Sequence, residues 1–405
     1  MRAGCLRLFS RLSRTAPLDG DHNATSLELF FDLVYVFAFT QVIALATQAH
    51  DALAVLQSLV VLGLLWWTWA NASWFANEAH ADSGLPRVGM ILTMAVVLLV
   101  ALVIPTAFRP HASRASALTI ATGFLMVGII FTVNWLIVTG SDRVLRRLVL
   151  RSFLTATVPS AALLVLGAVI GPPWQTIIWL AAFVVDAVII YFNLRASPRL
   201  NSARHFAERH ELVLMLALGE SIVSIGVSAS ALTLDVPLAI GVLLALSLAV
   251  ALWFAYFPHL SQSAQRTLRG QETTVRGKSA IDAYTYLHFV LITGIILTAV
   301  GIHVAVGHTA FAQFGGFGAA TLNAGVALYL LGSSLFSRRM QGRWLIIRIF
   351  GAVLLVGLIP VSAVAAPSIA TLVATVVVAG TLTLEYGIAH RHRLRNVTAV
   401  ENSIE

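Results

Sequence analysis

Apolar residues fill most of the chain in long blocks, which are separated by short polar stretches. Each block is about 20 residues long, the length that an α-helix needs to cross a hydrocarbon core of about 30 Å. The period-two alternation that marks a membrane β-strand is absent. The pattern predicts an all-α integral membrane protein with about twelve spans, at 27–48, 52–76, 88–108, 115–138, 149–170, 174–194, 210–231, 236–257, 280–306, 314–336, 344–364 and 366–387.

The last two predicted spans are separated only by an Ala-Ala-Pro-Ser turn that ends at Ser368, so they could instead form one broken hairpin. Composition agrees with a membrane protein, because 58% of the 405 residues are hydrophobic and only 11% are charged. A soluble chain carries roughly 25% charged residues. The single Cys5 excludes an intrachain disulfide and a cysteine-based metal cluster.

The net charge of +8 is distributed in a way that indicates membrane orientation and argues against nucleic-acid binding. Alternate loops and both tails carry 23 Lys and Arg residues, whereas the opposite side carries only Arg109 and Arg114. Positively charged loops stay in the cytoplasm. We therefore expect a multi-pass protein of the cytoplasmic (inner) membrane with both termini in the cytoplasm, and a first span that is retained and not cleaved as a signal peptide.

An internal duplication is indicated by sliding the sequence along itself by 179 positions. FDLVYVFAFTQVI (31–43) then aligns with HELVLMLALGESI (210–222), and WFANEAH (74–80) aligns with WFAYFPH (253–259). Internal repeats of this kind are common in transporters. The sequence predicts two tandem six-helix repeats of parallel orientation, with this organisation: a basic tail 1–26, repeats 27–195 and 210–387, a linker 196–209, a cytoplasmic loop 261–279 in the second repeat, and a tail 388–405.

Three stretches resemble the bacterial low temperature requirement A family of membrane proteins. They are LELFFDLVYVFAF in the first span, HFAERHELVLMLALGES (205–221) at the start of the seventh, and AYTYLHFVLITGIILTAVG (283–301) in the ninth. The resemblance implies a multi-span bacterial membrane protein. It implies no substrate, chemistry or catalytic residues.

Glu220 is the most prominent candidate residue, because it lies about twelve residues past Glu208 and so roughly 18 Å into the seventh span. Ser224 belongs to a small, hydroxyl-rich stripe beside it, which could line a wet cavity. The alternative is a protonated glutamate that hydrogen-bonds to a neighbouring helix. Its counterpart in the first repeat, Gln41, cannot titrate, so the two repeats are expected to differ.

Other acids occupy the cytoplasmic ends of predicted spans. Glu28 and Asp32 share one face of the first span, and Glu208 and Glu211 open the seventh. They could serve ion coupling, or they could cap helix starts and pair with Arg209 or another loop arginine. Asp186 lies inside the sixth span, where function competes with simple pairing to an arginine.

Two ring-bearing residues of the ninth span complete the candidate set. His288 lies one turn after Tyr284 and could relay protons to Glu220. Packing with a hydrogen bond is the alternative for a single histidine in a helical bundle.

The functional hypothesis is a proton- or cation-coupled secondary transporter of unknown substrate, with its site between the two repeats. An ion channel and an intramembrane enzyme acting on a lipid or isoprenoid are the alternatives. Enzyme activity is less favoured than transport, because no nucleophile, metal triad or cofactor site stands out. We expect no cofactor and no metal, and as partners only the lipid bilayer and a small molecule or ion. The oligomeric state and the transport direction stay open.

Overall fold

The computed structural model describes residues 23–79, 84–108, 114–196, 200–230, 232–307 and 313–401, with side chains up to residue 388. Contacts between Cα atoms divide the chain into two compact units. The first unit comprises residues up to Glu220 together with Gln265–Phe289. The second unit comprises Ser221–Ala264 and the residues from Val290 onward.

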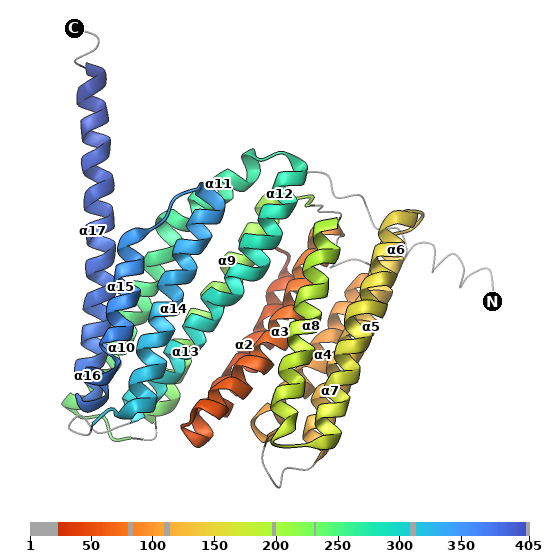
Figure 1. Cartoon of the computed structure of the whole chain (residues 1–405), viewed down its shortest axis with the longest axis horizontal. Coiled ribbons are helices and arrows are strands. Elements are labelled where there is room, and N and C mark those ends of the chain that lie inside the picture. Colours follow the sequence, from red (N-terminus) through yellow and green to blue (C-terminus); the bar gives the residue numbers. More distant parts are fainter. Residues whose placement is uncertain are drawn as a thin grey trace. The chain divides into compact units, whose positions relative to one another are not determined.

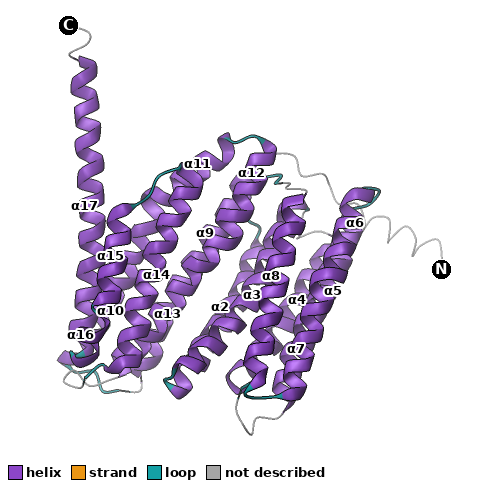
Figure 2. Cartoon of the chain, viewed as in Figure 1, coloured by secondary structure: helices purple, strands orange, loops and turns teal. Residues whose placement is uncertain are grey.

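The described residues form helices joined by turns and contain no strand, so the all-α prediction is confirmed (Figure 2). Eleven helices of the described chain are long and apolar enough to cross a membrane. The predicted span 344–364 is instead split into α15 (Ile346–Gly357) and the short α16 (Ile359–Val364). Pro360 explains the break, because proline lacks a backbone N–H and its ring clashes with the preceding turn of a helix.

The first unit contains the spans of the N-terminal half of the chain (Figure 1). Within it α2 packs against α3 and α4, α4 against α5, and α7 against α8. Its helices are α2 (Ser26–Ala49), α3 (Ala52–Glu78), α4 (Gly84–Val103), α5 (Arg114–Val138), α6 (Arg143–Ser152), α7 (Val158–Ile170), α8 (Trp174–Ala196), α9 (Ala203–Ser230) up to Glu220, and α12 (Thr273–Ser279).

Polar residues set where the helices of the first unit begin. Thr25 and Glu28 form a reciprocal capping box at the start of α2, in which each side chain accepts from the other residue's backbone N–H. Asp51 accepts from the Ala54 N–H at the start of α3, and Asp142 caps α6 in the same way. These caps place Glu28 at the first turn of its helix.

The second unit is built from the remainder of α9 and from α10 (Val236–Tyr256), α13 (His288–Gly307) from Val290 onward, α14 (Gly315–Gln341), α15, α16 and α17 (Pro367–Glu401). Glycines let α13 and α14 approach closely. A Cβ added to Gly301 would lie 2.5 Å from the Leu322 nitrogen, and one added to Gly325 would lie 2.4 Å from the Thr298 nitrogen. Such backbone contact is the usual role of small residues between membrane helices.

The segment 261–279, predicted as a cytoplasmic loop of the second repeat, is helical, and its side of the membrane stays a prediction. It forms α11 (Gln262–Gly270) and α12, and π-helical segments connect these two helices to α10 and α13. Sparse apolar residues on a basic amphipathic helix do not register as a span, which is why hydropathy alone reads such a segment as a loop. Within the predicted linker 196–209, α9 begins at Ala203. Residues 1–22 of the predicted basic tail lie outside the described part of the chain.

Candidate functional site

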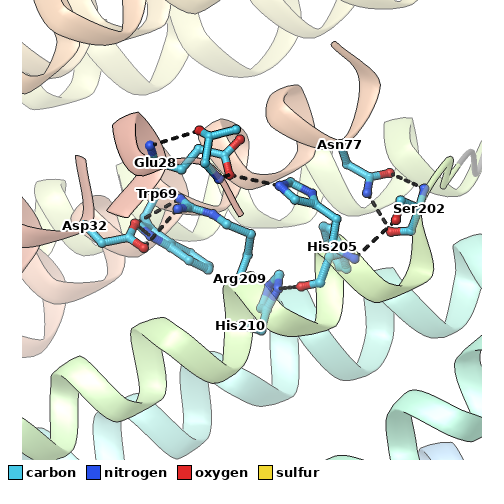
Figure 3. A network of polar contacts seen from close by, with 10 residues as sticks. Glu28, Asp32, Trp69, Asn77, Ser202, His205, Arg209 and His210 are labelled. Atoms are coloured by element: carbon cyan, nitrogen blue, oxygen red, sulfur yellow. Dashed lines mark hydrogen bonds and ion pairs between the residues drawn. The ribbon is translucent and has the colours of Figure 1, made fainter. Parts of the chain in front are cut away.

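Two acids of α2 pair with two basic residues of α9 inside the first unit (Figure 3). Glu28 Oε2 lies 2.9 Å from His205 Nε2. Asp32 accepts from both terminal nitrogens of Arg209, each at 2.9 Å. Each contact joins residues 177 positions apart, and on each helix the two residues are one turn apart, so α2 and α9 run parallel through this region.

The Asp32–Arg209 pair is fully enclosed. Both side chains are 0% exposed. Trp69 of α3 donates from Nε1 to Asp32 Oδ1 at 2.8 Å, and the Arg209 guanidinium lies 5.6 Å from the Trp69 ring. Bidentate geometry, a third donor and a cation–π contact are the kind of compensation that an ion pair removed from water requires.

The end of α3 fixes the residues that lead into α9. Asn77 donates from Nδ2 to the Ser202 carbonyl at 2.7 Å, and its Oδ1 accepts from the backbone nitrogen of Asn201 at 2.9 Å. The Ser202 hydroxyl in turn accepts from the His205 backbone N–H at 3.2 Å. These bonds set the position at which α9 begins, and so they align His205 and Arg209 with their acids.

A cluster of rings surrounds His210, one residue past Arg209. His210 Nδ1 donates to the Phe206 carbonyl at 2.8 Å. Tyr284 and His288 stack with their ring centroids 4.9 Å apart, and the His288 ring lies 5.2 Å from that of His210. The π-helical segment Ala280–Leu287 precedes His288, and single π turns are frequent at functional sites. The structure thus brings the predicted residues Tyr284 and His288 close to α9.

Glu220 lies apart from these ion pairs in the described contacts. Its side chain is 0% exposed, and its Oε1 accepts from the Thr40 hydroxyl at 2.8 Å. Its Oε2 has no hydrogen-bond partner among the described residues. Gln41, next to Thr40, is half-buried, and Ser224 belongs to the second unit. A wet cavity beside Glu220 therefore stays a prediction.

The remaining acids at the start of α9 face a different environment from Asp32. Glu208 and Glu211 line an open polar depression of 460 Å³ together with Arg204, Gln265 and Arg269. This depression is rich in charges of both signs. It does not share a lining residue with the Asp32–Arg209 pair.

A second feature of the first unit is a cavity of 170 Å³, which we call the aromatic cavity. It lies between α3, α5, α6 and α8, and its wall combines indole and phenyl rings with amides and hydroxyls. Its polar and aromatic lining residues are Trp67, Asn71, Trp74, Asn77, Glu78, Thr132, Trp135, Ser152, Phe153, Thr157, Asn193 and Thr285.

A smaller cavity of 80 Å³, the acid cavity, shares Trp67, Asn71, Gly128, Thr157 and Ile190 with the aromatic cavity. Asp186 of α8 lines it. This carboxyl group makes no hydrogen bond or ion pair with any residue that the structure describes.

Helix α3 forms a wall common to the ion pairs and the aromatic cavity. Trp66 stacks on Trp69 with a centroid distance of 5.0 Å and donates from Nε1 to the Thr285 carbonyl at 2.8 Å. Trp74 donates to the Thr285 hydroxyl at 2.9 Å. Thr285 and Trp74 line the cavity, while Trp69 holds Asp32, so α3 contacts both.

Sequence reasoning missed the contributions of Trp69, Asn77 and the cavity walls, and it treated Arg209 as a loop residue. One signal could have found the ion pairs. Glu28 and Asp32 are four residues apart, and His205 and Arg209 have the same spacing, so two parallel helices would pair both at once. No group of three or more His, Cys, Asp or Glu side chains that could hold a metal ion occurs in the described part of the chain.

Apolar helices of spanning length and charged pairs buried within them define a polytopic helical membrane protein. Residues 23–383 match the model of the family described as bacterial low temperature requirement A protein (LtrA), and the chain belongs to this family. It is also similar to an uncharacterized protein of Rhizobium meliloti (strain 1021), with 26% identity over 338 residues that cover 78% of this chain and 77% of that protein. No solved structure matches the chain significantly.

Proposed function

We propose that the protein is a proton- or cation-coupled secondary transporter. The observation that carries the proposal is the pairing of Asp32 with Arg209 and of Glu28 with His205, all nearly or fully buried within membrane-spanning helices. Ionisable groups inside a membrane are costly, and they mark ion and proton pathways in transporters. A purely structural role would be served at lower cost by apolar packing.

The coupling step that we propose is exchange at Asp32. A proton or cation that binds this carboxylate removes the charge that holds the Arg209 guanidinium and weakens the link between α2 and α9. Trp69 bonds to the same carboxylate, and its stacking partner Trp66 bonds to Thr285 at the cavity wall. Binding of a proton or cation at Asp32 would therefore alter the wall of the aromatic cavity through α3.

The duplication and the orientation are parts of the same proposal. The paired helices are the first spans of the two predicted repeats, so a site at Asp32–Arg209 would join the repeats, and the parallel course of α2 and α9 supports tandem repeats of like orientation. Arg209 is buried and so drops out of the loop charge. The imbalance of 23 against 2 charges then changes by one residue and still supports cytoplasmic termini in a bacterial inner membrane.

Uptake into proteoliposomes tests the proposal. Vesicles with the full chain and an imposed proton gradient are given a mixture of small metabolites, and the contents are compared by mass spectrometry with protein-free vesicles. We expect saturable, gradient-driven accumulation that is lost in the double variant Asp32→Asn/Arg209→Gln, which keeps a neutral hydrogen-bonded pair. The variant Asp235→Asn, at the cap of α10, is the matched control and should transport normally.

Other outcomes point to other functions. Ion currents that need no gradient coupling would indicate a channel. Absence of all flux together with turnover of an added lipid would indicate an intramembrane enzyme. Undiminished uptake by the double variant would exclude the ion pair as the coupling site.

A further inference from the structure

We propose that the aromatic cavity and the acid cavity together form a binding site for a small organic ammonium ion, with Asp186 as its counter-ion. This names the substrate class and in that respect rests on the proposed transport function. The site itself is argued from the first unit alone, in which all residues of both cavities lie.

The charge of the lining favours a cation. Glu78 lines the aromatic cavity and Asp186 lines the acid cavity, and none of the described residues that line either one is Lys, Arg or His. Glu78 accepts from Asn201 Nδ2 at 3.1 Å, so it has a protein partner. Asp186 has no such bond in the described chain. The two acids of the lining therefore favour a cationic ligand over an anionic one.

Asp186 is an ionisable group that lacks the arginine partner that Asp32 and Glu385 have. Asp32 has Arg209, and Glu385 of the second unit has Arg348 at 2.9 Å. A carboxylate away from water is costly unless it is paired or hydrogen-bonded. Asp186 is half-buried, and a cationic ligand would supply the counter-ion that the described residues lining the acid cavity do not.

The aromatic walls select an organic cation over a metal ion. Trp67 borders both cavities, and Trp74, Trp135 and Phe153 add further rings to the larger one. Indole faces attract ammonium groups through cation–π interactions, and alkylated ammonium ions are bound by aromatic cages of this kind. A hard inorganic cation would instead require several converging oxygen ligands.

The volume limits the ligand to a small molecule. A cavity of about 150 Å³ accommodates one benzene molecule, and the aromatic cavity measures 170 Å³. A trimethylammonium group with a short substituent fits this space, with its methyl groups against the tryptophan rings and its positive charge on the side of Asp186. Asn71 lines both cavities, and its Oδ1 accepts from Trp135 Nε1 at 3.1 Å. The remaining hydrogen-bonding capacity of this amide would be open to a polar substituent.

Equilibrium binding of choline to the purified full chain in detergent tests the inference. Its uncharged isostere 3,3-dimethylbutan-1-ol serves as the comparison, and tryptophan fluorescence and calorimetry report binding. We expect choline to bind at least tenfold more tightly than the alcohol, and Asp186→Asn to remove this preference. Asp51→Asn is the control variant, because asparagine caps a helix as well as aspartate does and Asp51 lies outside both cavities.

Thermal stability separates a ligand site from a structural role of the acid. If Asp186 is the counter-ion of a bound cation, Asp186→Asn raises the melting temperature of the ligand-free protein. Choline then stabilises the natural protein but not the variant. A lower melting temperature for the variant would show that Asp186 holds the fold. Equal binding of the alcohol, or displacement of choline by millimolar potassium, would also overturn the inference.

The failure of this inference and the failure of the transport proposal are distinguishable. Choline binding without gradient-driven uptake of any compound would support the ammonium site and contradict the transport proposal. The opposite result is gradient-driven uptake of other compounds, no choline binding and no effect of Asp186→Asn. It would support the transport proposal and contradict the ammonium site.

Discussion

Among the described residues, each unit contains one buried arginine, and the two arginines are used differently. In the first unit, Arg209 directs both of its terminal nitrogens to a single carboxylate, Asp32. In the second unit, Arg348 of α15 divides its donors among Glu385 of α17, the Ala255 carbonyl of α10 and the Ser333 hydroxyl of α14, at 2.9, 2.7 and 3.0 Å.

The difference suggests different roles for the two arginines. Arg348 ties four helices together, and two of its three acceptors are neutral groups that cannot change charge, so it is suited to a fixed structural link. Arg209 depends on one titratable partner, so neutralising the Asp32 carboxylate is enough to break its link. A permanent link and a switchable link require different hydrogen-bond acceptors. The sequence alone shows Arg209 and Arg348 but not the groups that accept from them.

The largest loss of stability is expected when one partner of the Asp32–Arg209 pair is replaced. Asp32→Asn leaves the Arg209 guanidinium buried without a counter-ion, and breaking such a pair typically costs about 3 to 5 kcal/mol. Chemical unfolding of the purified variant in detergent measures the loss. Arg209→Gln should be destabilised to a similar extent, because it leaves Asp32 in the same position.

The double variant Asp32→Asn/Arg209→Gln provides the control for that prediction. It has no buried charge, so most of the lost stability should return even though coupling does not. If the two single changes simply add in the double variant, the two residues do not act as a pair in the membrane protein.

The spans could be predicted from the sequence because hydropathy over about 20 residues reports burial in lipid directly. The ends of α2 and α3 fall within two residues of the predicted spans 27–48 and 52–76. The exceptions have local causes, namely Pro360, which splits one span, and the start of α9, where His205 and Arg209 look like loop residues until their partners on α2 are known. Hydropathy scores each residue alone, whereas a buried charge is acceptable only as one of a pair.

The second unit should be most sensitive where its backbones touch. Gly301→Ala places a Cβ 2.5 Å from the Leu322 nitrogen of α14, and backbone cannot move aside as a side chain can. Overpacking of this kind costs about 1 to 3 kcal/mol. Gly241→Ala in α10 is the matched control, since a Cβ there meets nothing within 4 Å. Unfolding curves of the two variants should differ, with only Gly301→Ala destabilised.

A smaller loss of stability is expected when Arg348 loses its one charged acceptor. Glu385→Gln leaves Arg348 with the Ala255 carbonyl, the Ser333 hydroxyl and an amide oxygen, and Glu385 is already 21% exposed. We expect a loss of about 1 to 2 kcal/mol, in the lower range for hydrogen bonds to charged groups. Unfolding in detergent measures it beside Asp32→Asn. A loss as large as that of Asp32→Asn would erase the distinction between the two arginines.

The candidate site could be predicted only in part, again for a physical reason. The acids Glu28, Asp32 and Asp186 and the rings of Tyr284 and His288 were recognisable as polar residues in apolar spans. Which acid is paired was not recognisable, because Arg209 lies 177 positions from Asp32 and nothing within α8 shows that Asp186 lacks a partner. The cavity walls were equally hidden, since the tryptophans of α3 face it only after the chain has folded.

The smallest effect on stability is expected at the outer pair of the first unit. Glu28→Gln keeps the capping box, since glutamine serves at this position, and its amide oxygen still accepts from the Thr25 backbone N–H. The amide can also bond to His205, so the loss should stay below about 1 kcal/mol, the difference between a charge-assisted and a neutral hydrogen bond. Melting curves of this variant and of Asp32→Asn then give a direct contrast one turn apart on the same helix. If Glu28→Gln proves as damaging as Asp32→Asn, the Glu28–His205 pair stabilises the first unit as much as the Asp32–Arg209 pair does, and the distinction between the two pairs fails.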